Sequence, residues 1–280
     1  MRKGYTTGLA TLAGLMILFG AGCDKLKSRD QINQGIAAFK SAKYSDAVEH
    51  FKQAAALDPS NNNAVVYMAT AYFAQWIPGA ESPENKEYAD RAKEGFLKAL
   101  ESDPSDKTVL KYLGAMAYSQ ASSLPQDQKL AKFDEAEQWY KKLIAIDPQD
   151  KEAYYYLAVI DYYRFHPALM LAKVDAHMRP EETGMLKDKK IRDALSAKYS
   201  STIDDGVAMA TKALDIDKEY DDAMVYLELL IRDKAALLDN KDEFAKQEQV
   251  ADNWLDKAMA TRKDKAAKAN KQTGGIVQDK

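Results

Sequence analysis

A short pattern of small and bulky residues recurs along this chain and constrains its fold more than any other feature. In its first copy Ala47, Phe51 and Ala54 stand at i, i+4 and i+7, so all three share one face of a helix. The alanines let a neighbouring helix approach closely, and the phenylalanine fills the space between them. Pro59 cannot continue the helix and biases Asp58 towards an extended conformation, so the segment is expected to end there.

The pattern recurs four more times at helical spacing. Further copies stand at Ala92, Phe96, Ala99; at Ala136, Tyr140, Leu143; and at Ala251, Leu255, Ala258, and a looser copy stands at Gly206, Ala210, Ala213. Such self-similarity predicts an all-α solenoid in which hairpins of two helices stack one on the next. The core of that fold is a seam between neighbouring hairpins, and a chain of 280 residues with 46% hydrophobic residues is able to fill it.

The first copy and the residues before it resemble the tetratricopeptide repeat. Gly35 on the expected first helix and Tyr44 before the second match that family, as do the three pattern residues and their closing proline. Gln31 and Gln34 stand where the family usually has Trp and Leu, which suits an N-terminal cap with no preceding repeat to pack against. The resemblance covers residues 28–262 and implies about five helix-turn-helix repeats.

Long insertions are expected within the repeats, because later copies are 44 to 70 residues apart and the family period is roughly 34. The extra residues fall between the two helices of a repeat. Residues 76–81 are predicted to form a loop, followed by a helix start with Ser82 as N-cap and Pro83 at the first helical position. A second break is predicted at 123–125.

The longest insertion is residues 166–190, where Pro167, Pro180 and Gly184 are expected to break the chain into short helical pieces. A long helix is predicted to follow, from about Asp188 to Leu214. The insertions also carry apolar residues, which either form a partner surface on one edge or fold back over the neighbouring helices. These residues are Trp76, Ile77, Pro78, Leu169, Met170 and Leu171.

The N-terminus is predicted to be an export signal, with a basic start, an uncharged and mostly apolar run over 4–19, and small residues over 20–22. Cys23 follows and is the only cysteine. This arrangement resembles the lipobox of bacterial lipoproteins, which implies cleavage of a signal peptide, 1–22, and lipid attachment to Cys23. An uncleaved membrane anchor and an ordinary signal peptide are the alternatives, although a run of roughly 16 residues is shorter than the about 20 that a spanning helix needs.

The remaining boundaries follow from these two features. Residues 23–29 are expected to form the lipidated cysteine and a short tether, and 30–262 the repeat domain. Residues 263–280 lack apolar periodicity and are predicted to be a disordered tail. The resemblance to lipoproteins implies a location in the cell envelope, on the inner or outer membrane, with the repeat domain outside the cytoplasm, in the periplasm.

No catalytic motif is present, and the chain is expected to be neither an enzyme nor dependent on a cofactor or metal. Its formal net charge of −3 does not indicate a nucleic-acid partner. His166 and His177 lie near Asp175 and Glu181, but a metal site needs three or four converging ligands, and exposed or capping histidines are the commoner case.

The family register places an aromatic residue at one first-helix position of the concave face in four of the five repeats. The residues there are Phe39, Phe73, Tyr118 and Tyr162, with Arg232 in the fifth repeat, and Lys111 and Tyr155 occupy a second groove position. Aromatic rings on a concave surface bury much area at low entropic cost, which suits binding of an extended peptide or a helix. With a small shift of register, the same rings lie in the core.

The predicted function is therefore that of a membrane-anchored scaffold for protein–protein interactions in the bacterial cell envelope, similar to repeat-bearing lipoproteins that assist assembly or secretion. Its expected partners are an envelope protein or peptide and the membrane itself. The alternative is a lipoprotein that binds glycan or peptidoglycan, because the run Tyr154, Tyr155, Tyr156 is able to stack on sugar rings. The fold alone does not decide between them.

Overall fold

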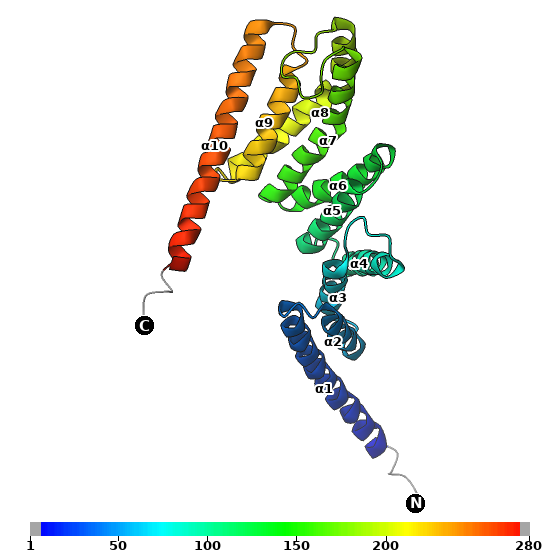
Figure 1. The fold of residues 1–280 in the computed structure, drawn as a ribbon. Coiled ribbons are helices and arrows are strands. Elements are labelled where there is room, and N and C mark those ends of the chain that lie inside the picture. The colour runs from blue at the N-terminus through cyan, green and yellow to red at the C-terminus, as the bar shows by residue number, and fades with distance from the viewer. Residues whose placement is uncertain (1–6, 275–280) are drawn as a thin grey trace, which may run out of the picture. The chain divides into compact units, whose positions relative to one another are not determined.

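The computed structural model describes the backbone of residues 7–274, and side chains from Cys23 to Lys271 except that of Asp127. This part of the chain contains ten α-helices and no strand (Figure 1). The helices are α1 (Thr7–Lys40), α2 (Tyr44–Leu57), α3 (Asn62–Gln75), α4 (Pro83–Ser102), α5 (Lys107–Ser122), α6 (Gln126–Ile146), α7 (Lys151–Asp175), α8 (Lys189–Ile216), α9 (Asp221–Ala235) and α10 (Lys241–Gly274). The all-α prediction with about five helix-turn-helix repeats is confirmed.

The chain divides into two compact units, unit 1 (Met1–Pro125) and unit 2 (Gln126–Lys280). The predicted repeat domain, 30–262, thus extends over both, and the boundary coincides with the break predicted at 123–125. In unit 1 each helix from α1 to α4 packs against the next. In unit 2 α7 packs against α6, α8 and α9, and α9 packs against α10.

The recurring pattern forms the interior of both units. Ala47, Phe51 and Ala54 are at most 1% exposed, and the other copies are equally buried apart from one residue, Leu255, which is 38% exposed. Gly35 allows the closest approach in unit 1, since a Cβ atom there would lie 2.5 Å from Cε1 of Phe51. The pattern works as the sequence predicts because small residues set the helix separation and large ones fill it.

The predicted loop at 76–81 is held against α4 by one buried amide. Asn85, 6% exposed, accepts a hydrogen bond from the Ile77 amide (2.7 Å) and donates to the carbonyls of Ile77 and Ala80, both at 2.8 Å. The predicted helix start is confirmed, because Ser82 accepts from the Asn85 amide as N-cap and Pro83 is the first residue of α4. An amide with a donor and an acceptor is suited to this task, since it satisfies loop groups of both kinds.

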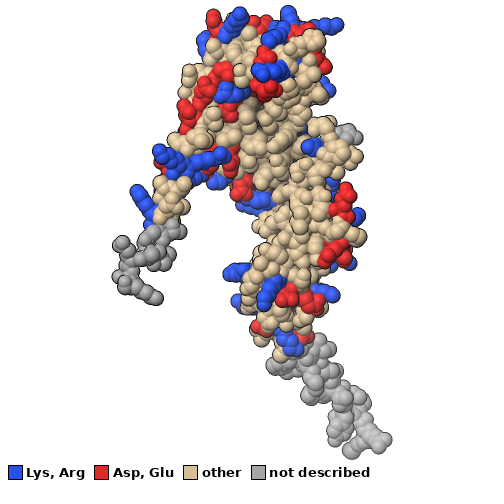
Figure 2. Space-filling view, in the orientation of Figure 1, with Lys and Arg blue, Asp and Glu red and all other residues tan. Residues whose placement is uncertain are grey.

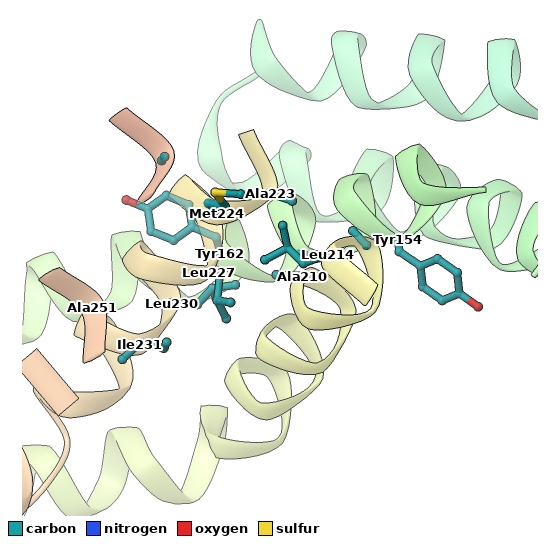
Figure 3. Packing of buried hydrophobic residues seen from close by; sticks show 13 residues of the cluster. Tyr154, Tyr162, Ala210, Leu214, Ala223, Met224, Leu227, Leu230, Ile231 and Ala251 are labelled. Carbon is teal, nitrogen blue, oxygen red and sulfur yellow. The ribbon is translucent and has the colours of Figure 1, made fainter. Parts of the chain in front are cut away.

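Unit 2 has its main core where α7, α8, α9 and α10 meet (Figure 3). The cluster combines alanines from all four helices with larger side chains that come mainly from α7 and α9, so small residues again allow the helices to approach closely. Members of this cluster are Tyr154, Ala158, Tyr162, Ala210, Ala213, Leu214, Ala223, Met224, Leu227, Leu230, Ile231, Ala251 and Ala258.

Pro167 does not break the chain, contrary to the prediction for 166–190. It lies inside α7, which continues to Asp175. A proline inside a helix costs about 3 kcal/mol, but burial of one large apolar side chain contributes about 1.5–3 kcal/mol, and both Phe165 and Leu169 are at most 1% exposed. Pro180 does lie in a non-helical segment, 176–188, and α8 follows it with Asp188 as N-cap, as predicted.

Both ends of the chain are more helical than predicted. Residues 24–29, expected to be a tether, belong to α1, where Ser28 is buried and donates to the Ala54 carbonyl at 2.8 Å. The tail expected from 263 is helical to Gly274, because its alanines and lysines favour helix and Lys265 forms an ion pair with Asp221 across to α9.

The signal-peptide prediction falls on residues that the structure does not fully describe. Residues 1–6 lie outside the described part, and of 7–22 only the helical backbone within α1 is described. Residues 275–280 are also outside it. Within the residues searched, none of the helices combines the length and the apolar character that a bilayer span requires.

Candidate partner-binding sites

Unit 2 contains a cavity of about 420 Å³, bounded by α7, α9, α10 and the segment 176–188. Its apolar walls come from three helices, and its rim is charged. The apolar lining residues are Leu169, Met170, Leu229, Ala236 and Phe244. A concave site with apolar walls and a few fixed polar groups is the usual form of a binding site.

A hydrogen-bonded pair of a partly exposed histidine and a buried aspartate lies on one wall of the cavity. His166 and Asp233 are joined by a 2.9 Å hydrogen bond between Nδ1 and Oδ2, and Asp233 is only 7% exposed. Burial raises the pKa of Asp233, and the bond to His166 opposes that rise. The ring of Tyr162 stacks on the imidazole with centroids 4.7 Å apart. The pair therefore presents a fixed polar surface to the cavity.

A buried lysine fixes the segment 176–188 over the cavity. Lys173, 8% exposed, donates from Nζ to the carbonyls of Glu182 (2.9 Å) and Pro180 (3.3 Å). At the far end of the segment, the Leu186 amide donates to the Ala236 carbonyl at 2.8 Å. Because these bonds tie the segment to both α7 and α9, the cavity is pre-formed.

Arg232, predicted to face the groove, lies at the cavity edge and joins α9 to α10. Its guanidinium forms ion pairs with Glu228, with Glu248 at 2.8 Å and with Asp252 at 2.6 Å. These carboxylates raise the pKa of Arg232. Its charge is therefore shared among three acids, and Glu248 lines the cavity beside it.

The two other predicted residues of unit 2, Tyr155 and Tyr162, are brought together, since the ring of each lies 5.6 Å from that of Tyr226. Tyr162 is 8% exposed and belongs to the core cluster, which is the second of the two placements the sequence allows. Tyr155 is half-buried and also contacts Tyr220 at 5.2 Å. Tyr155 thus packs on the neighbouring rings, and binding of glycan by the run 154–156 stays a prediction.

The predicted residues of unit 1 are all half-buried. Phe39 packs edge-on against Tyr44 with centroids 5.2 Å apart. Phe73 lies between Trp76 (5.8 Å) and Tyr112 (5.5 Å), so its ring is part of an aromatic cluster. Lys111 and Tyr118 both lie on α5 and keep part of their surface exposed.

The apolar residues of the insertions divide between the two expected placements. Ile77 and Leu171 are 64% and 68% exposed, whereas Leu169 is 1% exposed and forms a cavity wall. Trp76 folds back on Phe73. A second groove, of about 320 Å³, lies in unit 1 between α2, α3 and α4, with Val65, Met68 and Tyr72 on α3 among its lining residues.

Sequence reasoning missed the charged groups that shape the cavity. Asp233 stands between two other charged residues, Arg232 and Lys234, whereas Lys173 interrupts an apolar run, 168–174. An ionisable residue within such a run is the signal that was available, since a charge on a buried face needs a partner. Among the described residues, no three histidine, cysteine, aspartate or glutamate side chains are grouped so as to hold a metal ion.

Comparisons with known proteins agree with the helical repeat. The sequence model of the tetratricopeptide repeat matches residues 128–150, and that of the plant-specific mitochondrial import receptor subunit TOM20 matches 31–120. No curated protein matches the chain. A MamA double mutant, RS-1 ArsTM, superposes with a TM-score of 0.54 at 16% identity, covering 86% of this chain and 97% of its own.

A second solved structure, MamA 41-end from Desulfovibrio magneticus RS-1, gives a TM-score of 0.51 at 15% identity, with 85% of this chain and 96% of its own covered. At such identities the likeness shows the fold alone. The chain therefore has the fold of a tetratricopeptide-type helical solenoid. Proteins of this type act as scaffolds for protein interactions and are typically not enzymes.

Proposed function

We propose that this protein is a lipid-anchored scaffold of the bacterial cell envelope, and that the cavity of unit 2 binds a segment of a partner protein. The cavity carries the proposal, since its volume of about 420 Å³ lies between apolar walls with charged groups fixed around it. An apolar side chain of the partner would fill it, and the amides beside that side chain would meet the acids of the rim, Glu181 and Glu248.

The anchor is proposed from the small residues before Cys23 and from the state of that cysteine. Cys23 is exposed and free. It lies on α1, the helix whose Ser28 is bonded to α2. A lipid on Cys23 would thus be joined to the first repeat by a helix, which would hold unit 1 at a fixed distance from the bilayer.

Site-specific crosslinking in intact cells tests the cavity. A photo-crosslinking amino acid at Glu181 should capture a discrete partner, because this exposed residue lines the cavity. Thr183→Trp should abolish the adduct by filling the cavity, and the matched Thr183→Ser protein should retain it. An adduct that persists unchanged in Thr183→Trp would place the partner elsewhere.

Fractionation tests the anchor separately. The wild-type protein should enter the detergent phase, and Cys23→Ser should give an unprocessed or released protein. Equal partition of the two proteins would show that lipid on Cys23 is not the tether.

A further inference from the structure

The five copies of the pattern share one central position, and in the last copy that position is open to solvent. Its occupants are Phe51, Phe96, Tyr140, Ala210 and Leu255. The first four are at most 1% exposed, whereas Leu255 is 38% exposed. Because the four preceding copies bury this position completely, the exposure of Leu255 marks a packing surface that lacks its partner.

The first three copies show what normally covers this position. Phe51 contacts Tyr67 at 5.5 Å, and Phe96 stacks on Tyr112 at 5.0 Å. Tyr140 stacks on Tyr156 at 5.0 Å as well.

In the fourth copy, Ala210 belongs to a cluster against which Tyr226 packs. In all four copies a tyrosine stands 16 residues after the central position, on the first helix of the next repeat, and in the first three copies it contacts the central ring. A tyrosine on the following helix is thus the partner of the central ring in the three copies that have an aromatic residue there.

Within the described residues, α10 has no helix after it. Its exposed Leu255 is joined one turn later by Met259, which is 60% exposed. The equivalent of Met259 in the preceding copy is Leu214, which is 3% exposed. The outer face of a terminal repeat is normally polar, because nothing stacks on it. On α10 this face instead keeps the apolar residues of an internal repeat.

We propose that Leu255 and Met259 bind an amphipathic helix of a partner protein, and that this helix supplies a tyrosine or phenylalanine at the place where the chain's own first helices supply one. The three internal junctions with a printed ring contact indicate the chemistry of that helix, which is an aromatic ring over the central position. Such helix-in-groove recognition relies on a few apolar anchors at helical spacing.

Another occupant fits less well. A second copy stacked head to tail would offer α1, whose residues at the corresponding place are Asn33 and Gln34, both polar and exposed.

This surface is separate from the cavity of unit 2. On α10 the cavity is lined by Phe244 and Glu248, and neither Leu255 nor Met259 contributes to it. A partner on α10 and a partner in the cavity are therefore independent, and so are their tests.

The probe is a fluorescent, hydrocarbon-stapled peptide that copies α5, Lys107–Ser122, a first helix carrying Tyr112. Its binding to the full chain is measured by fluorescence anisotropy. We expect saturable binding that weakens at least about tenfold, or about 1.4 kcal/mol, for the Tyr112→Ala peptide and for Leu255→Asp protein.

The matched control is Val250→Asp. Val250 is 40% exposed on the same helix but lies about 140° around it from Leu255, so this change should alter affinity less than about twofold. Helical content by circular dichroism checks that each variant folds. Absence of saturable binding to the parent, or equal binding by all variants, would overturn the proposal. So would a concentration-dependent dimer that Leu255→Asp abolishes, because the face would then bind a second copy.

Discussion

Units 1 and 2 repeat the same pattern, but their interiors hold different kinds of polar group. Among the described residues, the buried polar side chains of unit 1 are neutral, Ser28 and Asn85. Unit 2 instead buries five ionisable side chains: Asp161, Lys173, Arg192, Glu228 and Asp233. Each unit also secures one insertion with a buried residue, an amide for the loop at 76–82 and an ammonium group for the segment 176–188.

The difference shows that one repeat pattern supports two kinds of interior. Neutral polar groups bind a loop without any dependence on pH, whereas buried charges must be paired and remain sensitive to protonation. Charged residues are spread over the surface of unit 2 as well (Figure 2), but there water screens them. The charges that distinguish the two units are the buried ones.

The largest expected effect is a loss of folding stability on mutation to alanine at the central pattern position, which we compare between the two units. Phe96→Ala should destabilise unit 1 by about 3–5 kcal/mol, since the ring is fully buried and leaves a cavity. Leu255→Ala, at the equivalent position of unit 2, should cost less than about 1 kcal/mol because the side chain already meets water. Urea denaturation followed by circular dichroism, with hydrogen exchange to assign the unit, measures both. Equal losses would contradict the account of α10 as an uncovered face.

The second prediction concerns the pH dependence of unit 2. Burial raises the pKa of Asp161 to about 7, although Arg164 at 3.2 Å opposes the rise. A carboxyl group whose pKa is higher in the folded chain binds protons preferentially there. Its contribution to stability is therefore lost as the pH rises from about 4 to 7, by an amount on the order of 2–4 kcal/mol.

Asp161→Asn removes this contribution. The free energy of unfolding of the variant, relative to that of the wild type, should therefore rise over the same pH range. Urea denaturation in a Trp76→Phe background isolates unit 2, because Trp139 and Trp254 then remain as the fluorescent reporters. If the difference in unfolding free energy between the two proteins does not change with pH, the pKa of Asp161 is the same in the folded and unfolded chains.

The third prediction tests the buried lysine of unit 2. Lys173→Met should leave the carbonyls of Pro180 and Glu182 without their donor, at a cost of about 1–3 kcal/mol. Amide exchange in 176–188 should accelerate, and exchange in unit 1 should stay the same. Lys187→Met is the matched control, because Lys187 is exposed and pairs only with the side chain of Glu182. Acceleration of the same size in the control would refute a special role for Lys173.

The smallest effect is expected where the two units are alike. Asp106 caps α5 of unit 1 by accepting from the Val109 amide at 3.0 Å, and Asp150 caps α7 of unit 2 by accepting from the Ala153 amide at 2.9 Å. Each change to alanine should therefore cost about 1 kcal/mol. Denaturation midpoints of the two variants provide the comparison, and a clearly larger loss for Asp150 would mean that this cap also supports the unit 2 core.

Local sequence predicted the helices, but it predicted only some of the residues at which they begin and end. Ser82 and Pro83 predicted the start of α4 because a cap depends on residues only three positions apart. The helix break predicted at Pro167 was wrong, because the burial of its neighbours Phe165 and Leu169 outweighs one lost backbone hydrogen bond. The helical continuation of α10 past 263 agrees with the helix propensity of its alanines and lysines, and it includes an ion pair from Lys265 to α9 that no local pattern contains.

The candidate site was less predictable than the fold. Arg232 was expected in the groove and lies at the cavity edge, but its three carboxylate partners come from two helices. His166 and Asp233 are 67 residues apart in sequence, and their meeting depends on how α7 packs against α9. The repeat register also allowed Tyr162 to lie either in the groove or in the core. In the structure it lies in the core, because α9 packs against it.

The sequence by itself determined the repeat: small residues at i and i+7 around a bulky one, which face a neighbouring helix because 3.6 residues make a turn. The tertiary structure decided which charges are buried, where the cavity opens, and that the central residue of the fifth copy, Leu255, is exposed. Those outcomes depend on groups brought together from distant parts of the chain, and spacing along one helix carries no information about them.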